Sequence, residues 1–349
     1  MITISEAVEQ YLATVTRRSG DQAQKKNATA RSYRNGLNTF RQSLKDAQID
    51  PDATDVSTIR EDWIDHLIDA LNDKSPATEN LYLSAASNFY HYLAAHELAE
   101  INLPRLKELV NQRSRKLGRR IPQFPRDEIE RLIAYAETLA TKSVEEVGAT
   151  AKTEKGRIQE RRRERLRNLR DRAFVLFLAD TGLRVSEACS LTLGDVNFLE
   201  GRLTVVGKGG DQAAVRISER ALKALKEYLE VRKSNYHAAG RKTKSLPLFT
   251  RHDRGANEDL ARIASSTAWD LVKARAAEAV GAEAAALIHP HSFRHYFVTV
   301  VLLATRNMEI ARRLARHKSI AVTQRYAEVD PELDEEYHEI FNRSGKSLH

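Results

Sequence analysis

The sequence predicts a mainly helical protein of two domains, the second of which also holds a small antiparallel sheet. The chain has 349 residues, more than the roughly 100–200 that one domain usually contains. Apolar residues recur at helical spacings in both halves of the chain, whereas strand patterns occur only around residues 203–217 and 247–250.

The first hundred residues carry the patterns of several helices. Four apolar side chains follow one another at spacings of 4, 3 and 4, as on one face of a helix: Tyr33, Leu37, Phe40 and Leu44. Ser75 is a good N-cap and Pro76 suits a first helical turn, so we expect another helix to begin there. Shorter helical patterns occupy about 4–14 and 58–71. We therefore predict a small all-helical domain over residues 1–110.

A basic segment at residues 111–122 is predicted to link the two domains. Its first ten residues, NQRSRKLGRR, hold five basic side chains and no acidic one, and prolines follow. It is either a solvated linker or a basic strap that crosses a phosphate backbone. Together with two arginines of the first domain, its cations are the candidate DNA-binding residues: Arg31, Arg34, Arg113, Arg115, Lys116, Arg119 and Arg120.

The second domain is predicted over residues 123–330 and begins with a helix at 126–141. The stretch at 142–170 ends in a run of mixed charge, which favours an exposed helix over a DNA contact. An apolar helix at 171–180 is closed by Gly182, because glycine suits the residue after a helix. Four more helices are expected at about 219–233, 265–281, 292–305 and 307–316.

A hairpin is the clearest strand signal in this domain. The segments LTVV (203–206) and AAVRI (213–217) flank a glycine-rich turn around Lys208. PLFT (247–250) is expected to add a third short strand.

Composition limits the possible functions. The 56 Lys and Arg residues against 48 Asp and Glu give a net charge of +8, which suits a polyanionic partner but does not identify one. The single cysteine, Cys189, excludes an intramolecular disulfide and a cysteine-based zinc site, and its apolar neighbours predict a core position. No signal-peptide pattern and no long apolar run are present, so we expect a soluble, cytoplasmic protein.

Two cationic side chains are candidates for phosphate chemistry. Arg184 opens a helix after Gly182, where its guanidinium can donate two hydrogen bonds to a phosphate. Glu187 lies on the same helix face and either orients Arg184 or merely pairs with it. Lys208 is either a solvated turn residue or an ammonium that protonates a leaving oxygen.

The segment HPHSFRHYF combines histidines with an arginine. His291 and Arg294 share a face at the start of a helix, and an imidazole beside a guanidinium resists protonation and can accept a proton. A zinc site of His289, His291 and His295 is the competing interpretation. The charge of Arg294 argues against it, so we predict no metal site.

A histidine and a tyrosine end the candidate set. His317 and Tyr326 lie nine residues apart near the end of the domain. A phenol has a pKa of about 10, so it needs nearby cations and a base to attack at neutral pH. Alone, Tyr326 is an ordinary exposed tyrosine.

Together these residues resemble the catalytic set of the tyrosine recombinase (phage integrase) family, in its Xer-like form. The resemblance rests on the motifs TGLRVSE, GKG, PHSFRH and TQRYAEVD and covers about residues 123–330. The spacings of 24 residues from Arg184 to Lys208 and 23 from Arg294 to His317 are similar to those of compact members. The helical N-terminal domain resembles the SAM-like core-binding domain of the family more loosely.

The resemblance implies a site-specific recombinase that cleaves and rejoins DNA without ATP, metal or another cofactor. Tyr326 would be the nucleophile and form a 3′-phosphotyrosyl intermediate, leading to a Holliday junction. The two arginines would hold the non-bridging oxygens, and Lys208 would protonate the leaving 5′ oxygen. His291 would assist proton transfer, His317 would hydrogen-bond the phosphate, and Glu187 would support the site.

The resemblance also implies an assembly. Four protomers would act on two double-stranded DNA molecules, with a monomer or dimer when free. Residues 331–349 would form a helix and tail that pack on a neighbouring protomer, or alternatively dock on their own domain. A catalytically idle DNA-binding regulator and a type IB topoisomerase are the competing functions.

Three features depart from the family pattern. The usual Leu-Gly-His before the second histidine is replaced by Ala315-Arg316-His317, so a large cation occupies a glycine position. Glu328 stands where a histidine is common, and the stretch 142–170 is longer than in compact members. None of these departures removes a catalytic group.

Overall fold

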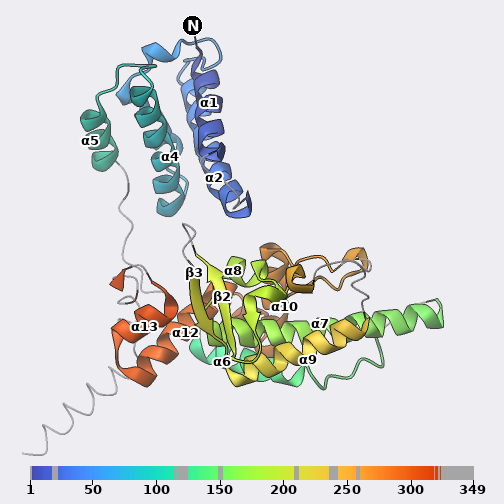
Figure 1. The fold of residues 1–349 in the computed structure, drawn as a ribbon. Helices are drawn as coiled ribbons and strands as arrows, with labels where there is room; N and C mark the ends of the chain where they lie inside the picture. The colour runs from blue at the N-terminus through green and yellow to red at the C-terminus, as the bar shows by residue number, and fades with distance from the viewer. Residues whose placement is uncertain are drawn as a thin grey trace, which may run out of the picture. The chain divides into compact units, whose positions relative to one another are not determined.

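The computed structural model describes residues 2–17, 23–113, 115, 125–147, 152–207, 212–235, 243–256, 260–317, 319–320 and 323. The chain divides into two compact units, Met1–Arg120 and Ile121–His349 (Figure 1). The described residues are mainly helical and include one small sheet, as the sequence predicts. No helix among them is both long and apolar enough to cross a membrane.

The first unit is built of helices joined by short loops in its described part. Its α-helices are α1 (Ile4–Arg17), α2 (Ala23–Asp46), α3 (Ile64–Ala70), α4 (Pro76–Ala95) and α5 (Leu103–Arg113). The predicted apolar face of α2 packs in the core, where Leu37, Phe40 and Leu44 have no exposed surface. Ser75 caps α4, because its Oγ accepts a hydrogen bond of 3.3 Å from the backbone N–H of Thr78. Both predictions are confirmed.

Helix α5 is not predicted from the sequence. Leu106 is buried, and Leu103, Leu109 and Val110 pack beside it at helical spacing, a short apolar face that the sequence analysis does not use. Ion pairs also fasten its end to α3: Arg113 lies 2.9 Å from Asp65 and 2.7 Å from Asp69. Only these ion pairs, which join residues far apart in the chain, leave no local pattern.

The second unit also has a mainly helical core. Its α-helices are α6 (Arg126–Thr138), α7 (Glu154–Thr181), α8 (Val185–Ser190), α9 (Glu219–Asn235), α10 (Ser265–Val280), α11 (Ala282–Ala285), α12 (Pro290–Thr305) and α13 (Met308–Ala315). Helices α6, α9, α10, α12 and α13 lie where the sequence predicts them.

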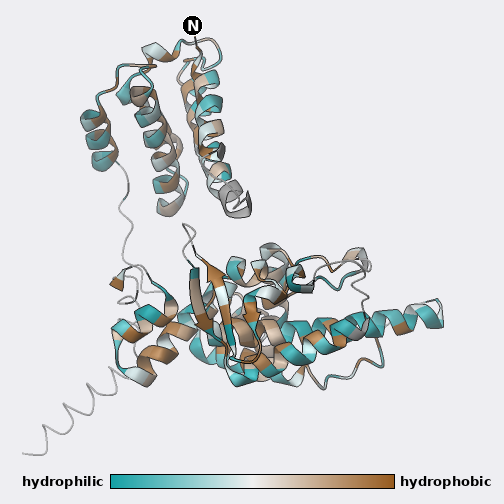
Figure 2. Cartoon of the chain, in the orientation of Figure 1, coloured by the Kyte–Doolittle hydropathy of each residue, from teal (hydrophilic) through white to brown (hydrophobic). Residues whose placement is uncertain are grey.

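Helix α7 is one continuous helix of 28 residues, whereas the sequence predicts an exposed helix followed by a separate apolar one. Its outer part is hydrophilic (Figure 2) and pairs charges along the helix, as between Arg163 and Glu160. From Leu166 onward most of its side chains are buried. The two segments join because no residue between them breaks the helix. Gly182 ends it in a left-handed conformation, as predicted.

A three-stranded antiparallel sheet lies beside these helices, in the order β1 (Val196–Asn197), β2 (Arg202–Val206), β3 (Gln212–Arg216). Leu203 on β2 is opposite Val215 on β3, and both are buried. The predicted hairpin is therefore confirmed.

The predicted third strand at 247–250 is wrong. Pro247 and Thr250 form only isolated bridges, and the third strand of the sheet is β1. Nη1 of Arg232 donates hydrogen bonds of 2.8 Å and 2.9 Å to the carbonyl oxygens of Pro247 and Leu248. A side chain thus satisfies backbone groups that a neighbouring strand would otherwise pair with.

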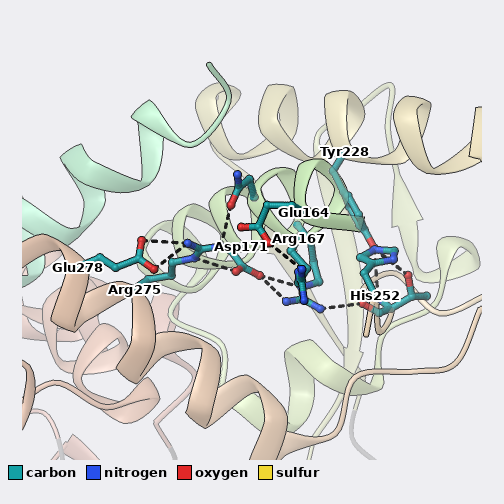
Figure 3. A network of polar contacts seen from close by, with 10 residues as sticks. Glu164, Arg167, Asp171, Tyr228, His252, Arg275 and Glu278 are labelled. Atoms are coloured by element: carbon teal, nitrogen blue, oxygen red, sulfur yellow. Dashed lines mark hydrogen bonds and ion pairs between the residues drawn. The ribbon is translucent and has the colours of Figure 1, made fainter. Parts of the chain in front are cut away.

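A buried polar network fastens α7 to α10 (Figure 3). Asp171 accepts hydrogen bonds from Nε of Arg170 at 2.8 Å and from Nε of Arg275 at 2.9 Å. Arg275 also donates to Asn168 at 2.8 Å and to Glu278 at 3.0 Å. Buried charges need such complete pairing. The network holds the C-terminal half of α7, whose end leads into the candidate active site.

Candidate active site

Arg184 lies at the junction between α7 and α8. The chain turns at Gly182 with φ +59°, and a Cβ there would collide with the ring of Phe297. Arg184 then serves as the N-cap of α8, and its backbone N–H donates a 3.0 Å hydrogen bond to Oε2 of Glu187. Its Nη1 donates to Oε1 of the same carboxylate at 2.9 Å. The Glu187 side chain is 2% exposed and that of Arg184 is 48% exposed, so this cation faces solvent.

Arg294 is the largest fully buried side chain of the described residues. It extends from the first turns of α12, and its Nη1 donates a hydrogen bond of 2.7 Å to the carbonyl oxygen of Gly182. Its Nη2 donates to the carbonyl oxygen of Ala315. One guanidinium therefore joins the ends of α7 and α13.

Three histidine rings follow one another at the start of α12. The rings of His289 and His291 stack with centroids 6.5 Å apart, and those of His291 and His295 meet edge-on at 4.7 Å. Desolvation, and then the charge of Arg294, lowers the pKa of His291. Desolvation, and then neighbouring histidines, lowers the pKa of His295 to about 4. Both rings are therefore neutral at pH 7, as the sequence predicts for an imidazole beside a guanidinium.

His317 follows the end of α13 and is 6% exposed. Its Nδ1 lies 2.9 Å from Oγ1 of Thr323, which is fully buried. Desolvation, followed by the charges of Arg294 and Arg184, lowers the pKa of His317 to about 4. The ring is neutral at pH 7 and held in one orientation.

Four of the six predicted catalytic residues form one cluster. Arg294 donates hydrogen bonds to the carbonyl oxygens of Gly182 and Ala315, which lie two residues before Arg184 and His317, and His291 is on the same helix as Arg294. The charges of Arg184 and Arg294 lower the pKa of both histidines, although the four residues lie at three separate places in the sequence. Such a group of cations and neutral imidazoles can bind a phosphate and exchange protons with it. Lys208 and Tyr326 lie outside the described residues.

The histidines of α12 carry no further sign of a metal site. Among the residues that the structure describes, no three His, Cys, Asp or Glu side chains are grouped so that they could hold a metal ion.

Cys189 is 4% exposed, and burial raises the pKa of its thiol to about 12. Its predicted core position is confirmed.

Comparison with known proteins identifies the family. Residues 124–332 match the phage integrase family, and residues 9–97 match the phage integrase N-terminal SAM-like domain. The chain belongs to the phage integrase family. The resemblance found in the sequence, to tyrosine recombinases of the Xer and integrase type, is thereby confirmed.

Curated relatives include Xer recombinases from several organisms. The chain is 35% identical over 163 residues to tyrosine recombinase XerC of Pelobacter propionicus, a match of 46% of this chain and 48% of that protein. It therefore spans about half the length of that relative. A match at 27% identity covers 86% of this chain and 86% of XerC of Thermodesulfovibrio yellowstonii. Another at 27% covers 93% of this chain and 94% of XerD of Mycobacterium tuberculosis.

Solved structures share the fold of this integrase-family chain. XerH bound to palindromic difH substrate has a TM-score of 0.59 at 17% identity, covering 90% of this chain and 80% of that one. A lambda integrase dimer bound to a COC' core site has a TM-score of 0.57 at 17% identity, covering 93% of this chain and 95% of that one. The predicted fold class is confirmed.

The candidate DNA-binding cations of the first unit have varied surroundings. Arg31 is exposed, and Arg34 is exposed but lies 3.0 Å from Glu9. Arg113 is the last residue of α5 and forms the ion pairs with Asp65 and Asp69 described above. Arg115 forms an ion pair with the buried Glu79. Acidic side chains of the same unit pair with these two arginines, and their contact with DNA stays a prediction. Lys116, Arg119 and Arg120 lie outside the described residues.

Two contacts of the site are not apparent from the sequence. Nη2 of Arg316 lies 2.9 Å from Oε2 of Glu187, although the two residues are far apart in the sequence. The unusual Ala-Arg-His motif points to this arginine but not to its partner. The hydrogen bond between Thr323 and His317 has no signal that separates it from any other threonine near a histidine.

Proposed function

We propose that this chain is a site-specific tyrosine recombinase that cleaves and rejoins double-stranded DNA. The observation that carries the proposal is the cluster of Arg184, His291, Arg294 and His317, which lies within the part of the chain that matches the phage integrase family. The bound DNA in the XerH and lambda integrase structures supports DNA as the partner.

The proposed cleavage step is a transesterification. The phenolic oxygen of Tyr326 attacks the scissile phosphorus, a new phosphorus–oxygen bond forms, and the bond to the 5′ oxygen breaks. Lys208 gives a proton to the departing 5′ oxygen. The phenol's own proton passes to His291, which is neutral at pH 7 and so able to accept it.

Positive charge stabilises this step. Negative charge builds on the non-bridging oxygens, and Arg184 and Arg294 would bind them as preorganised donors. If the Thr323 hydroxyl donates to Nδ1 of His317, the ring proton stands on Nε2, where it can be donated to a phosphate oxygen. Glu187 would act as a support at the start of α8, where its Oε2 accepts the backbone N–H of Arg184.

Rejoining reverses the same chemistry. The 5′ hydroxyl of a partner strand attacks the 3′-phosphotyrosyl bond and releases Tyr326. Because the bond energy is kept in the intermediate, rejoining consumes no ATP. The proposed steps also use no metal ion. Exchange of one strand from each duplex produces a Holliday junction, and exchange of the second pair resolves it.

We propose that the parts of the chain share this work. Residues 1–110 would be a core-binding domain, 111–122 a basic linker and 123–330 the catalytic domain. Residues 331–349 would pack on a neighbouring protomer of a tetramer on two DNA duplexes. The protein would act in the cytoplasm.

A recombination assay tests this function. Binding sites are first selected from a pool of random duplex DNA, and two copies are placed in one supercoiled plasmid. With EDTA present and ATP absent, the protein should produce excised or inverted circles. Binding without any strand exchange would favour the regulator. Relaxation of a plasmid that lacks the selected sites, at an equal rate, would favour the topoisomerase.

A further inference from the structure

Arg316 occupies a position where its backbone is strained. It ends α13 with φ 56° and ψ 43°, the left-handed conformation that a helix-ending glycine usually adopts. A residue with a Cβ pays roughly 1–2 kcal/mol there relative to glycine. The structure gives Arg316 a compensating contact, the 2.9 Å ion pair of its Nη2 with Oε2 of Glu187.

Glu187 is shared between two arginines. Its Oε1 accepts from Arg184 and its Oε2 from Arg316, and the carboxylate is 2% exposed. Burial alone would raise the pKa of Glu187, but the charge of Arg316, and then the hydrogen bonds from Arg184 and Arg316, lower it overall. Glu187 is therefore ionised at neutral pH and needs a cation beside it.

The two arginines differ in exposure. The side chain of Arg184 is 48% exposed, whereas that of Arg316 is 16% exposed. Nε of Arg316 is buried and has no hydrogen-bond partner within the described residues. Arg184 can thus turn toward solvent, but Arg316 is held beside the carboxylate.

We propose that Arg316 is a positioning residue that neutralises Glu187, so that Arg184 is released to bind the DNA phosphate. This inference rests on the proposed recombinase function. With a single cation, Glu187 would hold Arg184, because a buried carboxylate that loses its one partner is strongly destabilised. With Arg316 in place, Arg184 moves onto the phosphate while Glu187 stays paired.

Removal of Arg316 tests this arrangement. In Arg316→Gly the backbone strain disappears, so the melting temperature should stay equal or rise. The rate of covalent adduct formation on a nicked DNA site should nevertheless fall by about tenfold, the effect of one lost positioning contact. Arg316→Lys keeps the charge and should retain most of the wild-type rate.

A second substitution separates positioning from direct DNA contact. Glu187→Gln removes the charge that holds Arg184, so the double variant Arg316→Gly/Glu187→Gln should recover to within about threefold of the wild-type rate. If Arg316 itself binds the phosphate, or acts only in folding, the second substitution brings no recovery. Arg316→Met with and without Glu187→Gln gives the same comparison if the glycine variant does not fold.

The pH dependence gives an independent readout. Without Arg316 one of the two cations that lower the pKa of Glu187 is lost, so that pKa rises, and the cleavage rate of Arg316→Gly relative to wild type should increase as the pH is lowered. If the pH dependence of adduct formation by Arg316→Gly equals that of wild type, the proposal is overturned. It is also overturned if Arg316→Gly forms the adduct at the wild-type rate. If the wild-type protein forms no adduct at all, the recombinase function fails instead.

Discussion

Nη1 of Arg294 lies 2.7 Å from the carbonyl oxygen of Gly182 and donates a hydrogen bond to it. Nη2 of the same guanidinium donates to the carbonyl oxygen of Ala315. Arg184 follows the first of these carbonyls in the chain, and Arg316 follows the second. A buried side chain of α12 thus fixes both loops that present the other cations of the site.

Arg294 should therefore affect stability as well as activity. Arg294→Met leaves two buried carbonyls without this donor, at about 1–3 kcal/mol each. Arg184→Met removes an exposed cation and should change the free energy of unfolding by less than about 1 kcal/mol. Both variants should lose DNA cleavage. Urea unfolding without DNA checks the contrast, and equal stability of the two variants would contradict it.

Thr323 should be needed for efficient cleavage through its hydrogen bond with His317. Thr323→Val keeps the shape but removes the hydroxyl, so the proton on the His317 ring is no longer directed. We expect the rate of adduct formation to fall by about tenfold. Thr323→Ser restores the hydroxyl and serves as the control. If the valine and serine variants cleave equally fast, the hydrogen bond has no role in catalysis.

Gly182→Ala should destabilise the second unit more than its positive φ alone requires. The new Cβ would collide with the ring of Phe297, and such overpacking adds about 1–3 kcal/mol. Gly201→Ala is the matched control, because Gly201 has φ +61° but its nearest contact would be 3.5 Å away. The difference between the two melting temperatures measures the collision. Equal temperatures would show that Phe297 moves aside at no cost.

Stability should fall in acid because of His252. The ring is 1% exposed, its Nε2 lies 2.8 Å from the Tyr228 hydroxyl, and desolvation, then the charge of Arg170, lowers its pKa from 6.5 to about 3. Below pH 6.5 the unfolded chain binds a proton that the folded chain does not. The contribution of His252 to the free energy of unfolding is therefore complete above pH 6.5 and is lost as the pH falls toward 3.

The size of this effect can be measured by substitution. Between pH 6.5 and 5 the free energy of unfolding should drop by up to about 2 kcal/mol more in wild type than in His252→Asn. His96→Asn removes an exposed imidazole of the first unit and should leave the pH dependence of the second unit unchanged. If the free energy of unfolding of His252→Asn falls with pH as steeply as that of wild type, His252 is not the source of the acid sensitivity.

Local patterns in the sequence predict the elements that local chemistry determines. Ser75 and Gly182 mark helix ends by their own capping properties, and the glycine-rich turn around Lys208 predicts the hairpin. The segment 247–250 misleads because its apolar residues have strand propensity, while in the fold its backbone meets other segments only at isolated bridges and Arg232 binds two of its carbonyl oxygens. Tertiary context overrides propensity there.

In the candidate site, too, local patterns predict some features and only the folded chain shows the others. The motifs predict which residue types gather, and the structure brings Arg184, His291, Arg294 and His317 together. The contact between Arg316 and Glu187 joins residues 129 positions apart, and no periodicity encodes such a distance. Arg113 likewise reads as a free basic residue until the folded chain places Asp65 beside it.

The central claim is that Tyr326 becomes covalently attached to DNA. A duplex that carries the selected site and a nick next to the cleavage position traps the intermediate, because the short cleaved strand diffuses away. Proteolysis and mass spectrometry should then find a nucleotide on the peptide that contains Tyr326, and Tyr326→Phe should give none. An adduct on another residue, or one that persists in Tyr326→Phe, would contradict the claim.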